Sequence, residues 1–408
     1  MIKVGITGQS GFMGTHLFNF LSLKKDEIIL IPFNDAYFKS NIELEHFVKQ
    51  CDAIVHLAAM NRHGDPQIIY DTNIKLVNQL IDACEKTNSG PHILFSSSTQ
   101  EGKDNLYGKS KKDGRQLLED WANRNKTTFT GLVIPNVFGP FGNPYYNSVI
   151  ATFCYQLTHG ETPEIDMDVE MKIIYVGELV KIIYEKIKDK SKKTKAEESK
   201  GEGEKGRKGE VETYIVPYTC EKKVSEILSI LQDFKSGYFE YGIFPNLSDK
   251  FTLNLFNTFV CYIDHQKFFP FILKLNSDSR GNYVETVKMK SGGQISFSTT
   301  KPGITRGNHF HTRKAERFVV IRGKARIELR RIGTDKVLTF DLDGEKPSFV
   351  DMPIWYTHNI TNIGNEDVYT IFWINEFFNP DDPDTFSENV ELRANNTDRT
   401  VFGRYKSV

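Results

Sequence analysis

The sequence opens with Ile2-Lys3-Val4-Gly5-Ile6-Thr7-Gly8-Gln9-Ser10-Gly11-Phe12-Met13-Gly14, and this stretch decides the fold of the first half of the chain. Residues 2–7 have the apolar character of a buried strand, and a helical pattern follows from Thr15. Glycines at 8, 11 and 14 permit a tight turn and let the backbone approach a pyrophosphate at the helix N-terminus. The stretch therefore predicts a dinucleotide-binding turn at the start of a parallel α/β sheet.

Further strands and helices alternate along the first half of the chain, which predicts a doubly wound parallel sheet. The short apolar runs that indicate strands, and the periodic segments that indicate helices, are residues 27–32, 53–57, 92–96 and 131–134, and residues 75–86 and 110–123. A strand pattern at 211–217 and a helical pattern at 224–234 extend this domain. We place it at residues 1–248.

Residues 188–210 interrupt this domain with a different composition. Most of them are charged, Ala196 is the only aliphatic side chain, and glycine recurs. Such a segment buries too little apolar surface to offset the entropy of ordering it, so we predict a disordered surface insertion. Its basic and acidic residues are interleaved, which does not favour nucleic-acid binding.

Beyond residue 270 the pattern changes to short strands separated by Gly, Pro and Asn turns. The predicted strands are residues 283–287, 294–299, 317–321, 325–330, 337–341, 348–351 and 368–374. This spacing is typical of an all-β sandwich or barrel. The sequence therefore predicts that an α/β domain is followed by a β barrel, which we place at residues 270–390.

Composition excludes several classes of protein. The 408 residues include 52 basic and 53 acidic side chains, and the formal net charge of -1 gives no basic field for nucleic acid. The 5 cysteines are odd in number and form no CxxC pair, so we expect them to be reduced. We find neither the layout of a signal peptide nor an apolar run long enough to cross a bilayer. We therefore expect a cytoplasmic protein that binds no membrane.

A catalytic site is predicted where the strand of residues 92–96 ends. The run Phe95-Ser96-Ser97-Ser98-Thr99 closes that strand, and Tyr107-Gly108-Lys109-Ser110-Lys111 opens a helix. A Tyr and a Lys four residues apart share one helix face, so the Lys111 ammonium could lower the pKa of Tyr107 and help it exchange a proton with a substrate oxygen. A serine hydroxyl would polarise the same oxygen.

A metal site is predicted in the barrel from four side chains. His309 and His311 lie two apart in a strand pattern and would project from one face. Glu316 from the next turn and His358 from a later strand would complete a shell of three nitrogens and one oxygen. That set suits zinc or another borderline divalent metal.

The first half resembles the extended short-chain dehydrogenase/reductases, a family that acts on nucleotide-linked sugars with NAD or NADP. The resemblance rests on the glycine turn, His56-Leu57-Ala58-Ala59, Asn73, the serine run, the Tyr/Lys pair and Pro135-Asn136-Val137-Phe138-Gly139-Pro140. It implies that Ser98, Tyr107 and Lys111 are catalytic. It also implies these coenzyme contacts: Gly8, Gly11, Phe12, Met13, Gly14, Leu57, Ala58, Ala59, Tyr107 and Lys111.

Two features bear on the reaction and on the coenzyme. Thr99-Gln100 stands where dehydratases of this family carry an acidic pair, so ketone reduction is favoured over dehydration. Asp35, after the second strand, would suit the ribose diol of NADH and repel a 2′-phosphate. The family members to which the resemblance points use NADPH, so we expect NADPH, with NADH as the alternative.

The second half resembles the cupins, and within them the deoxysugar 3,5-epimerases, through the segments around Arg280, Arg306 and the four metal residues. The order of reductase and metal cupin resembles the CapF-type bifunctional epimerase/reductases. That resemblance implies a homodimer acting on a UDP-linked 4-keto-6-deoxy amino sugar, with C3 inverted at the metal and C4 reduced with NADPH. The product would be UDP-N-acetyl-6-deoxy-L-talosamine, on the UDP-N-acetyl-L-fucosamine route to surface polysaccharide. The predicted substrate contacts are Asn136, Tyr145, Asn147, Arg280 and Arg306.

Two other functions stay open from the sequence. The barrel could be a binding or dimerisation module beside a reductase of single activity, or the protein could be an epimerase that retains NAD. The acid/base group at C3 is also left open among Tyr356, Lys314, Lys301 and a water.

Overall fold

The structure is a computed structural model that describes residues 1–199, 209–279 and 281–391. The chain forms two compact units. Unit 1 contains Met1–Phe138, Tyr145–Ser148 and Glu170–Lys222, and unit 2 contains Gly139–Pro144, Val149–Val169 and the chain from Lys223 onward. This division differs from the predicted boundaries at 248 and 270, because helices from the predicted α/β domain pack in unit 2.

Unit 1 is built on one parallel sheet of 6 strands in the order β2-β1-β3-β4-β5-β8. The strands are β1 (Ile2–Thr7), β2 (Ile28–Ile31), β3 (Ala53–His56), β4 (His92–Ser98), β5 (Phe129–Ile134) and β8 (Val211–Ile215). Adjacent pairs are parallel throughout, which confirms the predicted α/β fold. The strand order reverses at β1, so the carboxyl ends of β1 and β3 form the edge where such sheets bind ligands.

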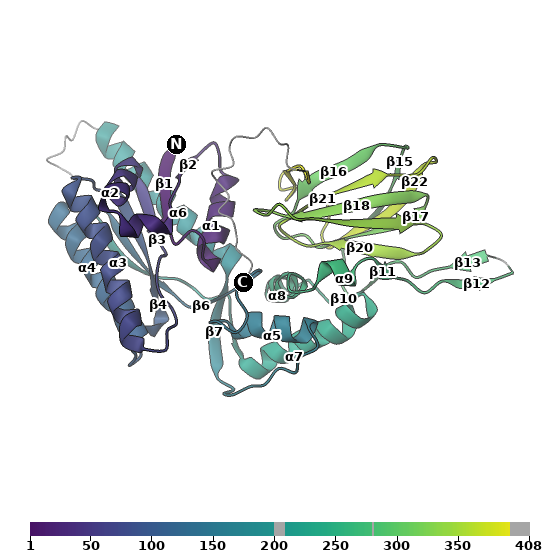
Figure 1. Cartoon of the computed structure of the whole chain (residues 1–408), viewed down its shortest axis with the longest axis horizontal. Helices are drawn as coiled ribbons and strands as arrows, with labels where there is room; N and C mark the ends of the chain where they lie inside the picture. Colours follow the sequence, from purple (N-terminus) through teal and green to yellow (C-terminus); the bar gives the residue numbers. More distant parts are fainter. Residues whose placement is uncertain (200–208, 280, 392–408) are drawn as a thin grey trace. The chain divides into compact units, whose positions relative to one another are not determined.

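Helices cover both faces of this sheet (Figure 1). Those of unit 1 are α1 (Phe12–Ser22), η1 (Asp35–Lys39), α2 (Asn41–Gln50), α3 (Pro66–Lys86), η2 (Thr99–Gly102), α4 (Leu106–Asn125) and α6 (Val176–Ser199). Helices α2, α3 and α4 pack side by side, and α1 packs on α6. A core that includes Phe47, Leu80 and Trp121 lies under helices α2, α3 and α4. A small sheet of β6 (Asn136–Phe138), β7 (Glu170–Tyr175) and β9 (Cys220–Lys223) completes the strands.

The predicted disordered insertion begins inside a helix, because α6 continues to Ser199. This is a correction to the prediction for residues 188–199. Lys, Glu and Ala are good helix formers and extend a helix without needing burial. At its start Lys188 pairs with Glu27 at 2.6 Å. Residues 200–208 of the predicted insertion lie outside the described residues.

Unit 2 contains two antiparallel sheets of 5 strands each, in the orders β11-β20-β17-β22-β15 and β19-β18-β21-β16-β23. The strands are β11 (Phe271–Ile272), β15 (Gln294–Thr300), β16 (Thr305–Phe310), β17 (Glu316–Arg322), β18 (Lys324–Arg331), β19 (Val337–Asp343), β20 (Ser348–Met352), β21 (Tyr356–Asn362), β22 (Val368–Ile374) and β23 (Phe386–Ser387). Their core includes Val319, Ile327, Leu329 and Phe349. The predicted barrel is confirmed, although residues 283–287 do not form the strand we predicted.

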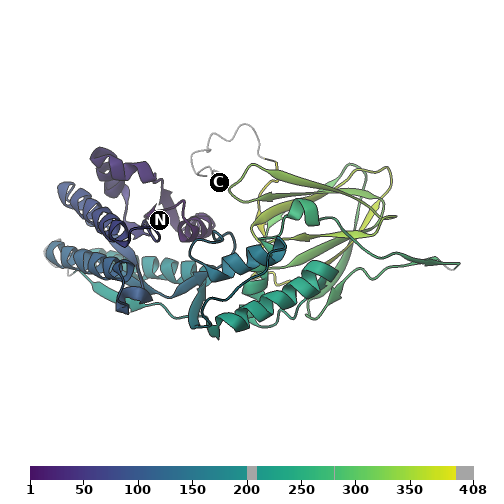
Figure 2. The same cartoon turned by 60° about the horizontal axis from the view of Figure 1, so that its bottom comes forward.

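Shorter strands accompany these sheets. They are β10 (Ile243–Phe244), β12 (Asn276–Asp278), β13 (Gly281–Tyr283) and β14 (Lys288–Met289). Strands β12 and β13 form a hairpin that extends beyond the two sheets in both ribbon views (Figure 2).

Three helices of unit 2, α5 (Val149–Thr158), α7 (Val224–Phe234) and α8 (Lys250–Val260), pack on one another. The short helix α9 (His265–Phe268) and the π-helical turn η4 (Lys235–Phe239) connect them to the barrel. Phe234 of α7 meets Phe256 edge to face at 5.4 Å, which explains why α7 packs in unit 2.

A buried ion pair joins this helical layer to the barrel sheet. Arg317 donates to both oxygens of Asp351 at 2.7 and 2.9 Å. Tyr238 of η4 donates to the same carboxylate at 2.6 Å, and Arg317 donates to the Gly242 carbonyl at 2.7 Å. The Arg317 guanidinium also lies 3.4 Å from the Phe349 ring centroid. The charges of the pair are therefore fully partnered inside unit 2.

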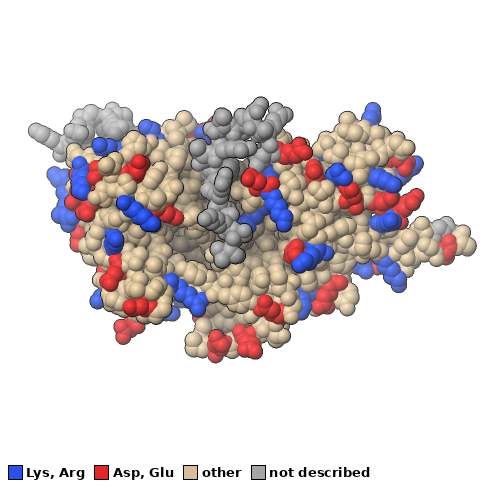
Figure 3. All heavy atoms as spheres, in the orientation of Figure 1, with Lys and Arg blue, Asp and Glu red and all other residues tan. Residues whose placement is uncertain are grey.

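Basic and acidic side chains are interspersed over the face of the molecule shown in Figure 3. That distribution agrees with the near-neutral net charge. Among the described helices, none combines the length and the apolar character that crossing a membrane requires.

Replacing Asp351 with Ala should destabilise unit 2 by about 3–5 kcal/mol, because Arg317 would be left as a buried, unpaired charge. The matched control is Asp341→Ala. Asp341 pairs with Arg326 in the same bidentate geometry, at 2.8 and 2.9 Å, but on the exposed surface, so little change is expected. Urea unfolding followed by tryptophan fluorescence measures both variants. Equal losses in the two variants would contradict the assignment.

Candidate active site and metal centre

The glycine turn after β1 has the tight geometry that its sequence predicts. Gly8 has a φ of 68°, and a Cβ there would lie 2.7 Å from the Ala58 backbone nitrogen. A Cβ on Gly14 would lie 2.2 Å from the Gly8 carbonyl oxygen. Only glycine fits at these two positions. The turn leads directly into α1, whose first residues are Phe12 and Met13.

The predicted coenzyme residues after β3 lie beside this turn. The register pairs Thr7 with His56, so both strands end together. The Thr7 hydroxyl lies 2.6 Å from His56 Nδ1 and accepts a hydrogen bond from Ala58 N–H at 3.3 Å. The residues after β3 therefore lie next to the glycine turn at the carboxyl edge of the sheet, where the strand order reverses; they are Leu57, Ala58 and Ala59.

Asp35 stands at the same edge. Its carboxylate accepts a hydrogen bond from the Ser10 hydroxyl at 3.0 Å, and both residues are exposed. Ser10 belongs to the glycine turn, so this contact fixes an acidic group beside the predicted dinucleotide site. The sequence pointed to Asp35 from its position after β2 but gave no indication that Ser10 would hold it.

The predicted catalytic serine and tyrosine lie on elements that pack closely. Ser98 ends β4, and its hydroxyl accepts a hydrogen bond from Gln100 N–H at 3.1 Å, which begins η2. A Cβ on Gly108 of α4 would lie 2.0 Å from the Gln100 carbonyl oxygen. Because glycine allows this approach, η2 lies directly against the first turn of α4. The short link between Ser98 and Tyr107 therefore brings their two elements together.

Tyr107 and Lys111 occupy one face of α4, as predicted, and the Lys111 ammonium lies 5.8 Å from the Tyr107 ring centroid. The expected lowering of the Tyr107 pKa is wrong in this structure. Burial and the nearby Tyr146 raise the pKa of Tyr107 to about 12. Burial lowers the pKa of Lys111 to about 8, and its ammonium donates to the Ser96 carbonyl at 2.9 Å. Tyr107 is therefore a neutral proton donor, which is the form that protonates an alkoxide.

The predicted substrate contacts of unit 1 are exposed. Asn136 begins β6, and Tyr145 and Asn147 lie in the short segment Tyr145–Ser148. Arg62 holds this segment by donating to the carbonyl oxygens of Tyr145 and Tyr146 at 2.7 and 2.9 Å. The roles of Arg62 and Tyr146 could not be predicted from sequence, because their contacts join segments far apart in the chain.

The four predicted metal ligands meet in unit 2. Potential ligand atoms of His309, His311, Glu316 and His358 all lie within 4.8 Å of one another. A Glu316 carboxylate oxygen lies 3.2 Å from His311 Nε2 and 3.5 Å from His358 Nε2. His358 Nε2 is buried and has no hydrogen-bond partner in the structure. Three imidazoles and a carboxylate converge as the donor set for zinc requires, so the residues fit a divalent metal.

The electrostatics of the cluster agree with such a site. Burial and the neighbouring histidines lower the pKa of His309 to about 4, so its ring is neutral and able to ligate. Burial alone would raise the pKa of Glu316, but the adjacent His311 and His358 rings outweigh it and lower that pKa. Glu316 is therefore ionised in a buried setting.

The local backbone differs from the predicted strand at one point. Strand β16 ends at Phe310, and the register shifts between Gly307 and His309, with Asn308 at a φ of 60°. His311 lies just beyond the strand, where its position depends on other segments. Its Nδ1–H donates to the Asp384 carbonyl at 2.6 Å. Glu316 and His358 lie on β17 and β21.

The structure gives less information on the other residues that were predicted to act in the barrel. Arg306 is exposed on β16, and Arg280 lies outside the described residues. Of the candidate acid/base groups, Lys301 is exposed. The Lys314 ammonium is engaged by the Pro383 carbonyl at 2.7 Å. Burial raises the pKa of Tyr356, which keeps its phenol protonated.

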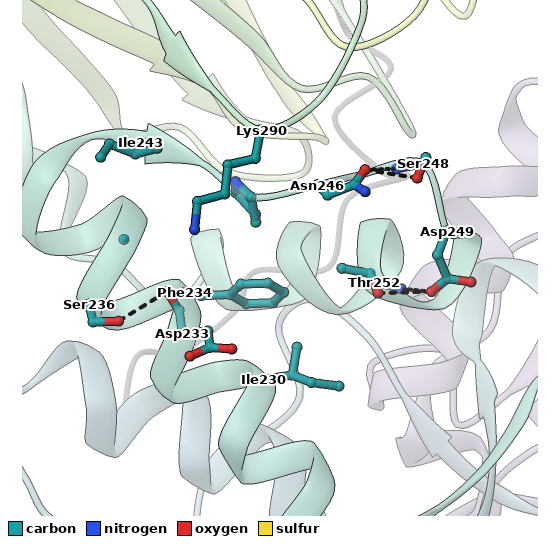
Figure 4. A pocket seen from close by; sticks show the side chains of 12 residues that line it. Ile230, Asp233, Phe234, Ser236, Ile243, Asn246, Ser248, Asp249, Thr252 and Lys290 are labelled. Atoms are coloured by element: carbon teal, nitrogen blue, oxygen red, sulfur yellow. Dashed lines mark hydrogen bonds between the residues drawn. The ribbon is translucent and has the colours of Figure 1, made fainter.

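A separate cavity of about 620 Å³ opens in unit 2 (Figure 4). The residues that line it are Ile230, Asp233, Phe234, Ser236, Gly237, Ile243, Pro245, Asn246, Ser248, Asp249, Thr252 and Lys290. None of the predicted site residues is among them. Several of its polar groups serve local structure: Asp249 caps α8 through Thr252 N–H at 2.8 Å, and Asn246 binds Ser248. We assign this cavity no ligand.

Fold and sites together define the class of protein. A parallel α/β sheet carries a dinucleotide turn and a Tyr/Lys pair, and an antiparallel β domain of cupin type carries a cluster of metal-ligating side chains. The chain is thus an extended short-chain dehydrogenase/reductase domain followed by a cupin-like domain.

Comparisons with known proteins give the family. Residues 4–198 match the NAD dependent epimerase/dehydratase family, and residues 276–386 match the Polysaccharide biosynthesis C-terminal domain. A UDP-2-acetamido-2,6-beta-L-arabino-hexul-4-ose reductase from Pseudomonas aeruginosa is 30% identical over 390 residues, covering 95% of this chain and 99% of the relative.

Two solved structures cover the same length. Capsular polysaccharide assembling protein CapF from Staphylococcus aureus is 34% identical with a TM-score of 0.57, and CapF with the inhibitor 3-isopropenyl-tropolone is 31% identical with a TM-score of 0.53. Each match covers 95% of this chain and 100% of the other. The chain belongs to the CapF family, and it joins a region of the NAD dependent epimerase/dehydratase family to a Polysaccharide biosynthesis C-terminal domain.

The pKa of Lys111 predicts a pH limit on coenzyme binding. Because burial lowers that pKa to about 8, the positive charge is present below pH 8 and is lost as the pH rises above it. The Kd for NADPH, measured by its fluorescence between pH 6 and 10, should therefore rise above about pH 8. In Lys111→Arg the charge persists, so the rise should disappear even if the Kd itself is larger. A wild-type Kd that is constant up to pH 10 would contradict this role.

Proposed function

We propose that the chain is a bifunctional nucleotide-sugar enzyme that inverts C3 of a UDP-linked 4-keto-6-deoxy amino sugar and then reduces the C4 ketone. The observation that carries the proposal is the presence, in one chain, of a protonated Tyr107 beside Lys111 and of a buried cluster of three histidines and Glu316. Full-length similarity to a reductase of a UDP-linked hexulose supports the substrate class.

The chemistry of the sugar sets the order of the two reactions. The proton on C3 is acidic only while C4 is a ketone, because the carbonyl stabilises the carbanion. Reduction removes that carbonyl. Inversion at C3 must therefore precede hydride transfer to C4, and a chain with both sites can supply the second with the product of the first.

In the reductase site, NADPH, when bound, would supply the hydride for C4. The Tyr107 hydroxyl would give its proton to the oxygen of the former carbonyl. Ser98 would donate a hydrogen bond to the same oxygen, and the Lys111 ammonium would hold the nicotinamide ribose and favour the tyrosinate that forms. Gly8, Gly11 and Gly14 would let the backbone approach the pyrophosphate. The phenol regains its proton from solvent between turnovers.

In the barrel site, we propose zinc, with another divalent metal as the alternative, held by His309, His311, Glu316 and His358. Bound there, the ion would act as a Lewis acid toward the C4 carbonyl oxygen and make the C3 proton more acidic. The proposed ligands would give the reaction a largely buried setting, since Glu316 and His358 are 6% and 1% exposed. A base of the barrel would take the C3 proton from one face, and return of a proton to the opposite face would invert the centre.

The substrate would be bound by a few placed groups. We propose Asn136, Tyr145 and Asn147 for unit 1, and Arg280 and Arg306 for the barrel, where guanidinium groups suit the diphosphate. The product would be UDP-N-acetyl-6-deoxy-L-talosamine, which serves the UDP-N-acetyl-L-fucosamine branch of surface polysaccharide synthesis.

We further propose a cytoplasmic homodimer. The cysteines are free, as expected in a reducing compartment. Ile295 and Phe297 are 57% and 73% exposed on β15, the edge strand of its sheet, and a second copy would remove this apolar surface from water. Sedimentation velocity on wild type and Phe297→Glu tests the assembly.

Separate variants should divide the two reactions. Tyr107→Phe should lose at least about 100-fold in NADPH oxidation, the lower end expected for a proton donor, yet still exchange the C3 hydrogen of the 4-keto sugar with solvent deuterium. His358→Ala, or wild type treated with a chelator, should lose the exchange. Proton NMR of the sugar and absorbance at the NADPH band measure the two reactions.

The outcomes separate the alternatives. Absence of exchange in a wild-type sample loaded with one zinc per chain would leave the barrel as a binding or dimerisation module. Loss of both reactions in folded Tyr107→Phe would contradict the division into two sites. Lack of any net NADPH oxidation by wild type would favour an epimerase that retains NAD.

We propose NADPH as the coenzyme and Asp35 as the residue that limits its preference over NADH. Asp35→Asn keeps the Ser10 contact but removes a negative charge that would repel a 2′-phosphate. The ratio of kcat/KM for NADPH to that for NADH should rise about tenfold, the change that 1.4 kcal/mol produces. Asp26→Asn, an exposed acidic residue that precedes β2, is the control. An unchanged ratio in Asp35→Asn would exclude this role.

A further inference from the structure

The segment that follows β22 wraps the loop between β16 and β17, and the two are joined at several points. We call residues 375–390 the C-terminal strap and residues 311–315 the ligand loop, because His311 begins it. At one end of the strap, Asn375 N–H donates to the Ala315 carbonyl at 3.2 Å, and Ala315 N–H donates to the Asn375 side chain at 2.9 Å. Further along, Phe386 and Ser387 pair with β16 beside His309.

The strap is also fixed beyond its strand. Arg330, which is 2% exposed, donates to the Val390 carbonyl at 2.7 Å and to the Glu388 carboxylate at 2.9 Å. Val390 N–H donates to the Asn308 side chain at 3.2 Å. Both ends of the strap are therefore tied to the barrel, and the part between them passes over the ligand loop.

Asp384 lies in that middle part and is 3% exposed. Its carboxylate accepts hydrogen bonds from three consecutive backbone N–H groups of the ligand loop: Thr312 at 3.1 Å, Arg313 at 3.0 Å and Lys314 at 3.2 Å. The Thr312 hydroxyl donates to it as well, at 2.6 Å. A carboxylate that is held by main-chain donors fixes the path of the whole loop, whatever its side chains do.

The same residue contacts a metal ligand through its backbone. The Asp384 carbonyl accepts the proton on His311 Nδ1 at 2.6 Å, and a carbonyl can only accept. This bond places the proton on Nδ1 and leaves Nε2, which faces Glu316 at 3.2 Å, with a lone pair for the metal. The carbonyl points to the ring because Asp384 has a φ of 40°, a left-handed conformation that Asp and Asn adopt more readily than most residues.

We propose that Asp384 is a positioning residue for the barrel metal site: its carboxylate sets the ligand loop, and its carbonyl sets the tautomer and orientation of His311. The inference rests on the metal site of the proposed function. It adds that the C-terminal strap belongs to that site, although the strap supplies no ligand of its own.

Lys314 fits the same assignment. Its side chain is buried and donates to the Pro383 carbonyl, the residue before Asp384, at 2.7 Å. Its ammonium also lies 3.8 Å from Glu376. Lys314 belongs to the ligand loop, and its side chain therefore binds the strap, whereas Asp384 belongs to the strap and binds the loop. Because its ammonium makes these contacts, we do not assign Lys314 as the C3 base.

The test is zinc affinity, measured by competition with a chromophoric chelator at a temperature where every variant is folded. Asp384→Asn keeps the size, the left-handed φ and the carbonyl, but its side chain cannot accept from all the donors of the loop. Loss of such outer contacts weakens metal binding by about 10–100-fold, and we expect a loss in that range. Asp384→Gly, which keeps the φ but no carboxylate, should lose at least as much.

Asp382→Asn is the matched control. Asp382 lies on the same strap and pairs with Arg313 at 3.1 Å, but it touches no backbone donor of the ligand loop. Asp382→Asn removes the same charge as Asp384→Asn does. The zinc affinity of the Asp382 variant should stay within about twofold of wild type, as expected for an exposed pair. Substituting Co²⁺ gives a second readout, because the visible absorption bands of the ion report its coordination geometry and should change only in the Asp384 variants.

Each outcome has one meaning. Weaker zinc binding and an altered Co²⁺ spectrum in Asp384→Asn, with neither in Asp382→Asn, support the proposal. A lower melting temperature without a change in zinc affinity would overturn it and leave Asp384 as a structural residue, and so would equal losses in the Asn variants of both sites. Failure of the wild-type protein to bind zinc or Co²⁺ would instead contradict the proposed function.

Discussion

Buried carboxylates have to be surrounded by donors or positive charge, and unit 2 is organised by three of them. Asp351 has a permanent cation, Arg317, with Tyr238 as a further donor. Asp384 has main-chain N–H groups and a threonine hydroxyl. Glu316 has only two histidines, of which His358 Nε2 has no hydrogen-bond partner. The first two arrangements are electrostatically complete without a ligand. Glu316 is the carboxylate that has no permanent cation or full set of donors around it, and that difference favours the proposed metal site.

In the reductase half, burial likewise determines which groups are charged. Burial makes it costly to ionise Tyr107 and to keep Lys111 charged. The pKa of Tyr107 therefore rises, and the pKa of Lys111 falls. A neutral phenol suits reduction, in which the enzyme must give a proton to a new alkoxide. The Lys111 ammonium donates to the Ser96 carbonyl and is charged below about pH 8. The two residues thus divide the tasks of donor and cation.

Much of each site could be predicted because its residue types are local in the chain. Gly8 and Gly14 are required by close backbone approaches, and a Cβ at either would collide with neighbouring backbone. His309, His311 and Glu316 lie within one short segment, so their closeness in space could be predicted, although His311 lies just beyond β16 and is oriented by Asp384. The boundaries of the units could not be predicted in this way. Helix α7 has a clear apolar pattern, but the pattern does not say which partner will cover it, and Phe256 of α8 does.

The sequence by itself determined the order of domains, the dinucleotide turn, the Tyr107/Lys111 pair and the set of three histidines and Glu316, because each depends on short spacings and on the chemistry of residue types. Only the tertiary structure decided the protonation of Tyr107, the contact of Asp35 with Ser10 and the place of Asp384 behind His311. Those depend on burial and on neighbours brought together from distant segments; Asp384 and His311 are 73 residues apart in the chain. No local pattern encodes such a pairing, since the fold creates it.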